Sequence, residues 1–365
     1  MKIRDIIKVI EDVAPLSLQE DFDNAGVQIG NVEAEATGAI LCLDITEAVL
    51  DEAIERKCNL VISHHPLIFK PLKSITGATY IERCLIKACK HDIVIYSAHT
   101  NLDNAVGGVN FHLARLLGLD DIRILSPQKN RLLKLVVYVP QNHAEKVREA
   151  IFSAGAGHIG NYDLCSFNID GSGSFRAGEN THPYCGRKGE IHIEKETRIE
   201  TILPAHCKNS VLQALFKNHP YEEPAYDLYA LSNTWNSAGS GVVGCLPEEE
   251  NARQFLLRVK ALFNVPSVKT SVFSEEKNIR KVALCGGSGA FLIPDAISVG
   301  ADVFITGEAR YNDYYVEGKI ILAVIGHYES EVVTTDLFKA IISEKFPTFA
   351  QHFSNAINSN PINYI

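Results

Sequence analysis

The sequence has few features of a disulfide-stabilised or membrane-embedded protein. Its nine cysteines are odd in number and scattered, and no two have the C-x-x-C spacing. A disulfide framework and a structural zinc ribbon are therefore not expected. No stretch approaches the roughly 20 apolar residues that cross a bilayer, and the first residues lack the apolar core of a signal peptide. We expect a cytoplasmic protein with no membrane partner.

An excess of basic residues is also lacking. Lys and Arg number 35 against 44 Asp and Glu, for a net charge of -9, which disfavours nonspecific binding to nucleic acid. Hydrophobic residues make up 46% and charged residues 22%, as in ordinary globular proteins. At roughly 100–200 residues per domain, 365 residues predict two domains.

Apolar strands alternate with amphipathic helices at the start of the chain and again near its end. In the first part, strands are predicted at 40–43, 60–63 and 93–97, with helices at 46–56, 80–90 and 109–117. In the last part, strands are predicted at 281–284, 302–306 and 320–325, with helices at 293–299 and 335–346. This alternation predicts an α/β fold with a parallel sheet covered on both faces.

The residues between these parts have a different pattern. Strands are predicted at 132–139, near 191, at 198–203 and at 225–231, with helices at 144–154 and 210–217 and glycine-rich turns at 155–160 and 171–178. The order is β-α-β-β-α-β, the ferredoxin-like plan. Residues 128–244 hold 12 basic and 12 acidic residues, so the whole net charge lies outside them. We expect residues 1–127 and 245–365 to fold as one α/β unit, interrupted by an inserted ferredoxin-like domain at 128–244.

Three segments rich in histidine and carboxylate each follow the end of a predicted strand. They are Ser63-His64-His65-Pro66, Ser97 to Asp103, and Gly326 to Glu331. Ligands of open α/β sheets bind outside the carboxyl ends of the strands, so these segments can converge on one crevice. Imidazole and carboxylate together suit zinc, iron or manganese. We predict a metal site here.

The number of donors favours two divalent ions. The adjacent His64 and His65 point apart in an extended strand, so a single ion would not use both easily. Two ions roughly 3.5–4 Å apart, bridged by a carboxylate, would lower the pKa of a shared water and leave an open position on each ion. The bridge would be one of the carboxylates of these segments. His99 is the least secure ligand, because it could instead contact a ligand carboxylate or a substrate.

Other polar groups near predicted strand ends are candidates for substrate binding. Asn24 lies in what reads as a turn at 23–28 and could contact a substrate, although a purely local turn fits equally well. Gly287 and Ser288, within a glycine-rich stretch, could present N–H groups to a phosphate, but no complete phosphate-binding motif is present. Glu308 ends another strand and could act as an acid or base, or could be an ordinary surface glutamate.

Taken together, these motifs resemble the GTP cyclohydrolase 1 type 2 homolog family, the interacting-factor-three-like proteins. The motifs are Ser63 to Pro66, His99 to Asp103, Gly286 to Gly289, Thr306 to Glu308, and Gly326 to Glu331. The resemblance implies a dinuclear metal site on His64, His65, Asp103, His327 and Glu331, with His99 beside it. It also implies a toroidal homohexamer. Where the family usually has tryptophan near its start, this sequence has Phe22.

The middle of the chain resembles the PII/CutA-like domain that long bacterial members carry. The segment His219 to Tyr226 matches the characteristic run of that domain, and from the residues alone it also reads as a rigid turn bounded by Pro220 and Pro224. The resemblance implies that this domain senses a small ligand or a partner.

Two functions therefore remain open. One is a metal-dependent hydrolase that acts on a nucleotide, a phosphoester or an amide, with Glu331 and His99 as catalytic groups. The other is a regulatory or metal-handling protein that senses a small ligand through the insert. A purely structural metal site is usually closed, and the few donors here favour the enzyme.

Overall fold

The computed structural model describes residues 1–355 and 360–363, and these divide into two compact units. The first unit combines Met1–Ser126 with Ala238–Ile365, and the second is Pro127–Ser237. Within the described residues, no helix is long and apolar enough to cross a membrane.

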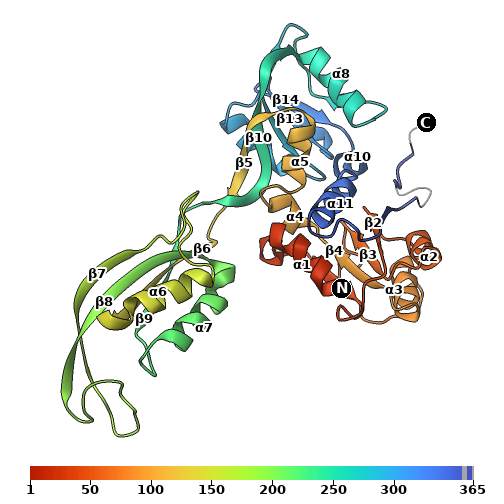
Figure 1. Ribbon diagram of the computed structural model, residues 1–365. Coiled ribbons are helices and arrows are strands. Elements are labelled where there is room, and N and C mark those ends of the chain that lie inside the picture. The colour runs from red at the N-terminus through yellow and green to blue at the C-terminus, as the bar shows by residue number, and fades with distance from the viewer. Residues whose placement is uncertain (356–359, 364–365) are drawn as a thin grey trace. The chain divides into compact units, whose positions relative to one another are not determined.

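Five of the described strands form one sheet of the first unit, in the order β1-β4-β3-β2-β15. Figure 1 labels β4, β3 and β2 side by side. Their bounds are β1 Gly26–Ile29, β2 Ala39–Cys42, β3 Leu60–Ser63, β4 Val94–Ser97 and β15 Gln351–Phe353. Strands β15, β2, β3 and β4 are parallel, and β1 is antiparallel to β4. Every residue of β2, β3 and β4 is buried, as expected where helices cover both faces.

The helices of this part are α1 Ile3–Val13, α2 Glu47–Glu55, α3 Tyr80–Lys90, α4 Thr100–Asn104, α5 Val109–Leu116 and α11 Thr334–Lys345. Helices α2 and α3 pack on one face of the sheet, and α1 packs against α11 on the other (Figure 1). The Thr46 side chain accepts a hydrogen bond from the backbone N–H of Val49 and caps α2. Such a cap stabilises a helix by about 1 kcal/mol.

Six described strands form the second sheet of the first unit, in the order β11-β14-β13-β12-β10-β5. They are β5 Asp120–Gln128, β10 Trp235–Asn251, β11 Lys269–Thr270, β12 Asn278–Cys285, β13 Val303–Thr306 and β14 Ile321–Val324. The accompanying helices are α8 Ala252–Leu262, α9 Ile293–Ser298 and α10 His327–Glu331. Strands β12, β13 and β14 are parallel, so their carboxyl ends share one edge.

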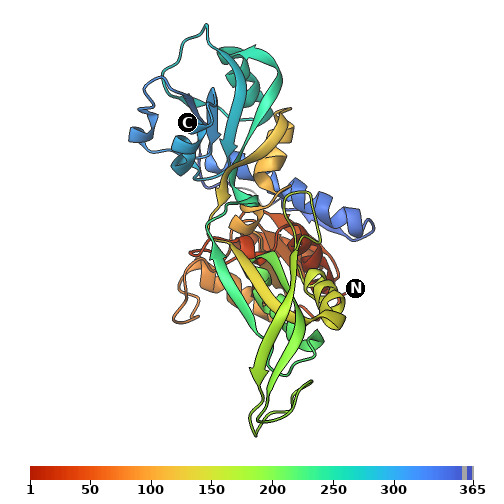
Figure 2. The same ribbon diagram turned by 90° about the vertical axis from the view of Figure 1, so that its left-hand side faces the viewer.

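The second unit has the element order β-α-β-β-α-β. Its elements are β6 Leu132–Pro140, α6 Ala144–Ser153, β7 Phe167–Arg176, β8 Ile191–Pro204, α7 Lys208–Asn218 and β9 Tyr226–Leu231. The four described strands are antiparallel in the order β7-β8-β6-β9. Helices α6 and α7 bury Val147, Ile151, Val211 and Leu215 in the core beneath this sheet. Figure 2 shows β7 and β8 as a long pair of strands.

Some boundaries differ from those that the sequence suggested. Residues 171–178 were expected to form a glycine-rich turn, but most of them belong to β7, and 191–204 form one strand where two were expected. A Cβ at Gly173 would lie 2.2 Å from Glu196 Oε2, so glycine at this position leaves room for that carboxylate. Part of the expected turn at 23–28 lies in β1. The sequence placed the end of the insert at 244, whereas Val242 and Val243 already pair with β12 of the first unit.

Candidate metal centre

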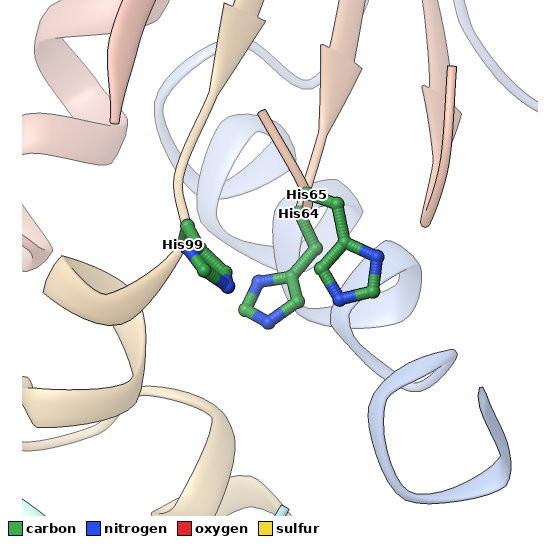
Figure 3. Close-up of side chains that lie close together, drawn as sticks. All are labelled: His64, His65 and His99. Carbon is green, nitrogen blue, oxygen red and sulfur yellow. The ribbon is translucent and has the colours of Figure 1, made fainter. Parts of the chain in front are cut away.

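Four histidines and two carboxylates come together in the first unit, each on a segment that follows a buried strand. His64 and His65 follow β3, His99 follows β4 and leads into Asp103 of α4, and His327 and Glu331 lie on α10 after β14. Figure 3 shows the rings of His64, His65 and His99 gathered beyond the ends of two neighbouring strands. Their ring centroids are 5.2–5.5 Å apart.

Local contacts determine how these segments leave the sheets. The hydroxyls of Ser63 and Ser97 lie 2.8 Å apart and join the ends of β3 and β4. On the other sheet, Gly326 has a φ of 102°, a region that favours glycine, and α10 begins immediately after it. The resulting single turn of helix places His327 and Glu331 four residues apart on one face, so that their side chains meet.

Glu331 is the centre of two groups of donors. Its Oε1 lies 3.7 Å from His64 Nε2, and that same nitrogen is 3.7 Å from Asp103 Oδ1. Its Oε2 lies 2.9 Å from both His65 Nε2 and His327 Nε2. The donors within each group lie within 4.8 Å of one another, as metal ligands do. The two oxygens of one buried carboxylate therefore face different sets of ligands.

The expectation that His64 and His65 would point apart is only partly met. His64 faces Asp103 and His65 faces His327, but both also reach Glu331. A third group of possible donors joins His64, His65 and His99.

The acceptors beside Nδ1 determine which nitrogen each ring turns toward Glu331. His64 Nδ1 lies 2.8 Å from the carbonyl oxygen of Ala98, which can only accept, so Nδ1 carries the proton. His65 Nδ1 lies 2.8 Å from Asp44 Oδ1, and His327 Nδ1 lies 3.1 Å from Glu308 Oε1. When neutral, each of these rings directs the lone pair of Nε2 toward Glu331. Metal-binding histidines are commonly held in this way.

The donor set fits a cation. His64 Nε2 is fully buried and has no hydrogen-bond partner among the described residues, and an orphaned buried acceptor is costly. His65 Nε2 and His327 Nε2 lie 3.3 Å apart beside one carboxylate oxygen. When the rings are neutral, the Nε2 atoms of His64, His65 and His327 each carry a lone pair that points into the centre. These lone pairs repel one another unless a proton or a metal ion lies among them.

The pKa shifts of the centre show how strongly its carboxylates and imidazoles interact. Burial lowers the pKa of His65, but its contacts with Asp44 and Glu331 outweigh burial and raise the pKa to about 10. Burial raises the pKa of Glu331, but the three surrounding imidazoles hold it well below the usual range. Burial raises the pKa of Asp103, and the Glu331 charge acts in the same direction. The centre therefore attracts positive charge strongly.

His99 is oriented by a carboxylate that belongs to neither group of donors around Glu331. It precedes α4, and its ring hydrogen-bonds through Nδ1 to Asp23 Oδ1 at 2.7 Å, not to Asp103. Burial raises the pKa of Asp23, but the hydrogen bonds from His99 and Thr100 lower it to about 2. Asp23 is thus a carboxylate that fixes the proton of His99 on Nδ1.

The glycine-rich loop has a role that the sequence did not reveal. A Cβ at Gly287 would lie 2.1 Å from Glu331 Oε1, and the residue has a φ of 58°. The Gly287 N–H donates to Ser330 Oγ, and the neighbouring N–H groups of Gly286 and Gly289 donate to side chains of the protein. The loop therefore makes room for Glu331, and these three N–H groups are already engaged.

Ser288 and Glu308 lie beside His327. The Ser288 hydroxyl donates to Glu308 Oε2, and both residues line a cavity of about 690 Å³ that also includes His327. Lys269, Arg310, Phe291 and Tyr314 line the same cavity.

Asn24 is exposed and hydrogen-bonded within the protein. Its Nδ2 donates to the carbonyl oxygen of Ile68 at 2.6 Å, and its backbone carbonyl oxygen accepts from Gln28 Nε2 at 2.7 Å. The first contact joins the segment to a residue 44 positions away, so the segment is more than a local turn.

Sequence reasoning missed Asp44, although a signal for it was present. Asp44 follows β2 at the same edge of the sheet as His64 and His99, so the rule that found those residues applies to it. Asp23 was noted only as part of a turn, and nothing local indicates that it would meet a histidine 76 residues away.

Comparison with known proteins agrees with these motifs. The model of the Duf34/NIF3 (NGG1p interacting factor 3) family matches residues 1–361. The "GTP cyclohydrolase 1 type 2 homolog" of Halalkalibacterium halodurans is 42% identical over 99% of this chain and 98% of its own. The protein of the same description from Bacillus subtilis is 38% identical, with the same coverage.

A solved structure is also similar over the whole chain. The Bacillus cereus protein described as related to NIF3 has a TM-score of 0.82 and 37% sequence identity, covering 100% of this chain and 99% of its own. The mixed α/β fold with several sheets is therefore shared with that protein.

Proposed function

This chain belongs to the Duf34/NIF3 family, and we propose that it is a hydrolase that uses two divalent metal ions joined by Glu331. One observation carries the proposal. Three imidazoles turn Nε2 toward a single buried carboxylate, and each has an acceptor at Nδ1. The two oxygens of Glu331 face different imidazoles, as expected for a carboxylate that bridges two ions.

The proposed assignment gives one ion His64, Asp103 and Glu331, and the other ion His65, His327 and Glu331. These nitrogen and oxygen donors suit zinc, iron or manganese. When bound, such ions activate water and polarise a phosphoryl or carbonyl oxygen.

The remaining residues have roles in proton transfer and in binding. His99 carries its proton on Nδ1, toward Asp23, which leaves Nε2 able to accept a proton during the reaction. The cavity beside His327 offers Lys269 and Arg310 for a phosphate, and Phe291 and Tyr314 for stacking on a ring. Ser288 and Glu308 would hydrogen-bond the substrate there. We infer a nucleotide or a related phosphoester or amide as substrate.

A second candidate function is regulatory, with the unit at 127–237 as a PII/CutA-like sensor. Two observations favour it: the β-α-β-β-α-β order, and a cavity of about 560 Å³ in this unit that Arg176, Arg198 and Tyr184 line. We also propose that the chain assembles as a toroidal homohexamer. Phe167 on β7 and Ile191 and Ile193 on β8 are 65–75% exposed, which suits a subunit contact.

Replacement of Glu331 tests the proposal. The purified chain, loaded with Zn²⁺, Mn²⁺ or Fe²⁺, is assayed for turnover of nucleotides, phosphoesters and amides, together with its metal content and native mass. Glu331→Gln should lose bound metal and turnover while it stays folded. Glu329→Gln is the matched control, since Glu329 is buried on the same short helix but belongs to neither group of donors.

The outcomes separate the two functions. Turnover in Glu331→Gln at the wild-type rate would refute the role of Glu331. Metal binding without turnover of any substrate in the panel would favour the regulatory function.

A further inference from the structure

We propose that Cys185, His192 and Glu194, in the second unit, form an additional cation site that takes Zn²⁺. Their Sγ, imidazole and carboxylate donor atoms lie within 4.8 Å of one another. None of the three belongs to the centre around Glu331, so the proposal does not depend on the function of that centre.

The strand and the loop before it bring these residues together. His192 and Glu194 are two residues apart on β8, so their side chains share one face of the sheet. Cys185 lies in the connection between β7 and β8, which folds back over this face. A Cβ at Gly186 would lie 2.8 Å from His192 Cβ, and Gly186 has a φ of 79°. Glycine therefore allows the loop to pass close enough for the thiol to reach the imidazole.

Neighbouring aromatic side chains hold the donors in place. The ring of Phe175 packs edge-on against His192 with centroids 5.5 Å apart, and His192 Nε2 lies 2.8 Å from Glu194 Oε2. The Tyr221 hydroxyl lies 3.8 Å from Cys185 Sγ and donates to Glu196 Oε1 at 2.9 Å. The side chains of His192 and Glu194 are each 29% exposed, so an ion can reach them from solvent.

The ligand chemistry selects the metal. One thiolate, one imidazole and one carboxylate suit zinc, which binds sulfur, nitrogen and oxygen ligands in tetrahedral geometry. Binding releases the thiol proton, and the thiolate and carboxylate then neutralise the two charges of the ion. Three protein ligands leave a fourth position for water or a small ligand. Phe175 and Tyr221, which contact His192 and Cys185, also line the cavity of the second unit.

Cobalt distinguishes this site from the centre around Glu331. Co²⁺ commonly substitutes for zinc, and a cobalt–thiolate bond has an intense near-ultraviolet charge-transfer absorption that nitrogen and oxygen ligands do not produce. The donor groups around Glu331 contain no cysteine. Titration of the metal-free full-length chain with Co²⁺ should therefore give this absorption from Cys185 alone, and added Zn²⁺ should abolish it.

Matched variants make the test decisive. Cys185→Ser should remove the absorption, whereas Cys165→Ser should retain it, since Cys165 is a partly exposed cysteine of the same unit. Loss of a residue that only hydrogen-bonds to a metal ligand weakens metal binding by roughly 10–100-fold. Because His192 and Glu194 are proposed as ligands themselves, His192→Ala and Glu194→Gln should weaken Co²⁺ binding by at least that factor. Glu331→Gln should leave the absorption unchanged. Circular dichroism confirms that each variant is folded.

The proposal is overturned if the wild-type chain shows no thiolate absorption, or if Cys185→Ser keeps it. If Cys185→Ser does not fold, unchanged Co²⁺ affinity in both His192→Ala and Glu194→Gln overturns it equally.

Discussion

Replacement of Gly287 by alanine should separate the cost of an unfavourable backbone from the loss of the metal centre. Gly287 has a φ of 58°, where a residue with a Cβ costs about 1–2 kcal/mol. The new Cβ would also lie 2.1 Å from Glu331 Oε1. Real Cβ contacts are almost never shorter than 3.0 Å, so the carboxylate would have to move away by about 1 Å. A displacement of about 1 Å in a catalytic site can lower the reaction rate by up to about 100-fold.

The carboxylate cannot retreat without breaking its contacts. Glu331 is 4% exposed and lies 2.9 Å from both His65 and His327. We therefore expect Gly287→Ala to bind divalent metal about 10–100-fold more weakly than the wild-type chain.

Gly300→Ala is the matched control. Gly300 has a φ of 67°, so it carries the same backbone cost, but a Cβ there would meet no atom within 4 Å. Urea denaturation of the metal-free proteins should show Gly300→Ala destabilised by about 1–2 kcal/mol, and Gly287→Ala by more, because its Cβ also displaces Glu331. Calorimetric titration with Zn²⁺ should show weakened binding only in Gly287→Ala. Equal Zn²⁺ affinity in the two variants would refute the inference that Glu331 must occupy its present position to bind metal.

Two further predictions concern Asp44, which holds the proposed metal ligand His65, and the stability of helix α3 in acid. Asp44→Ala removes the acceptor that holds His65 Nδ1 and should weaken Zn²⁺ binding about 10–100-fold in the same titration; Asp51→Ala, on an exposed ion pair, should leave it unchanged. Glu82, at the start of α3, accepts hydrogen bonds from Thr76, Ala78 and Thr79, which lower its pKa to about 2. Because the folded pKa lies below the usual value of 4.5, this stabilisation is complete above about pH 4.5 and is lost as the pH falls toward 2. The stability difference between the wild-type chain and Glu82→Gln in urea should therefore shrink over that interval, and a constant difference would contradict the assignment.

Much of the fold could be predicted because its pattern is local. The strands β2, β3 and β4 are short runs of mostly apolar residues, of which the last two end in serine, and helix α2 begins after the capping residue Thr46. The pairing of β15 with β2 could not be predicted, since it joins residues more than 300 positions apart and the strand is only three residues long. Strand β7 was missed because it is mostly exposed and rich in glycine and serine, so it lacks a buried apolar face.

The candidate site was predictable to a similar degree. The positions of His64, His99 and His327 just past buried strands predict that they lie at sheet edges. The contact between His65 and Glu331 depends on how the two sheets of the first unit pack together, because 266 residues separate the two side chains in the sequence.

The sequence by itself determined which residue types stand at the ends of the strands, because strand periodicity and position along the chain are local properties. Only the tertiary structure decided which nitrogen each imidazole turns inward, since that depends on Asp44, Glu308 and the carbonyl of Ala98. It also decided the role of Gly287. The glycine-rich pattern suggested phosphate binding, whereas in the structure Gly287 leaves space for the Glu331 carboxylate. Orientation and close approach are properties of pairs of segments, and a linear sequence does not specify the distance between them.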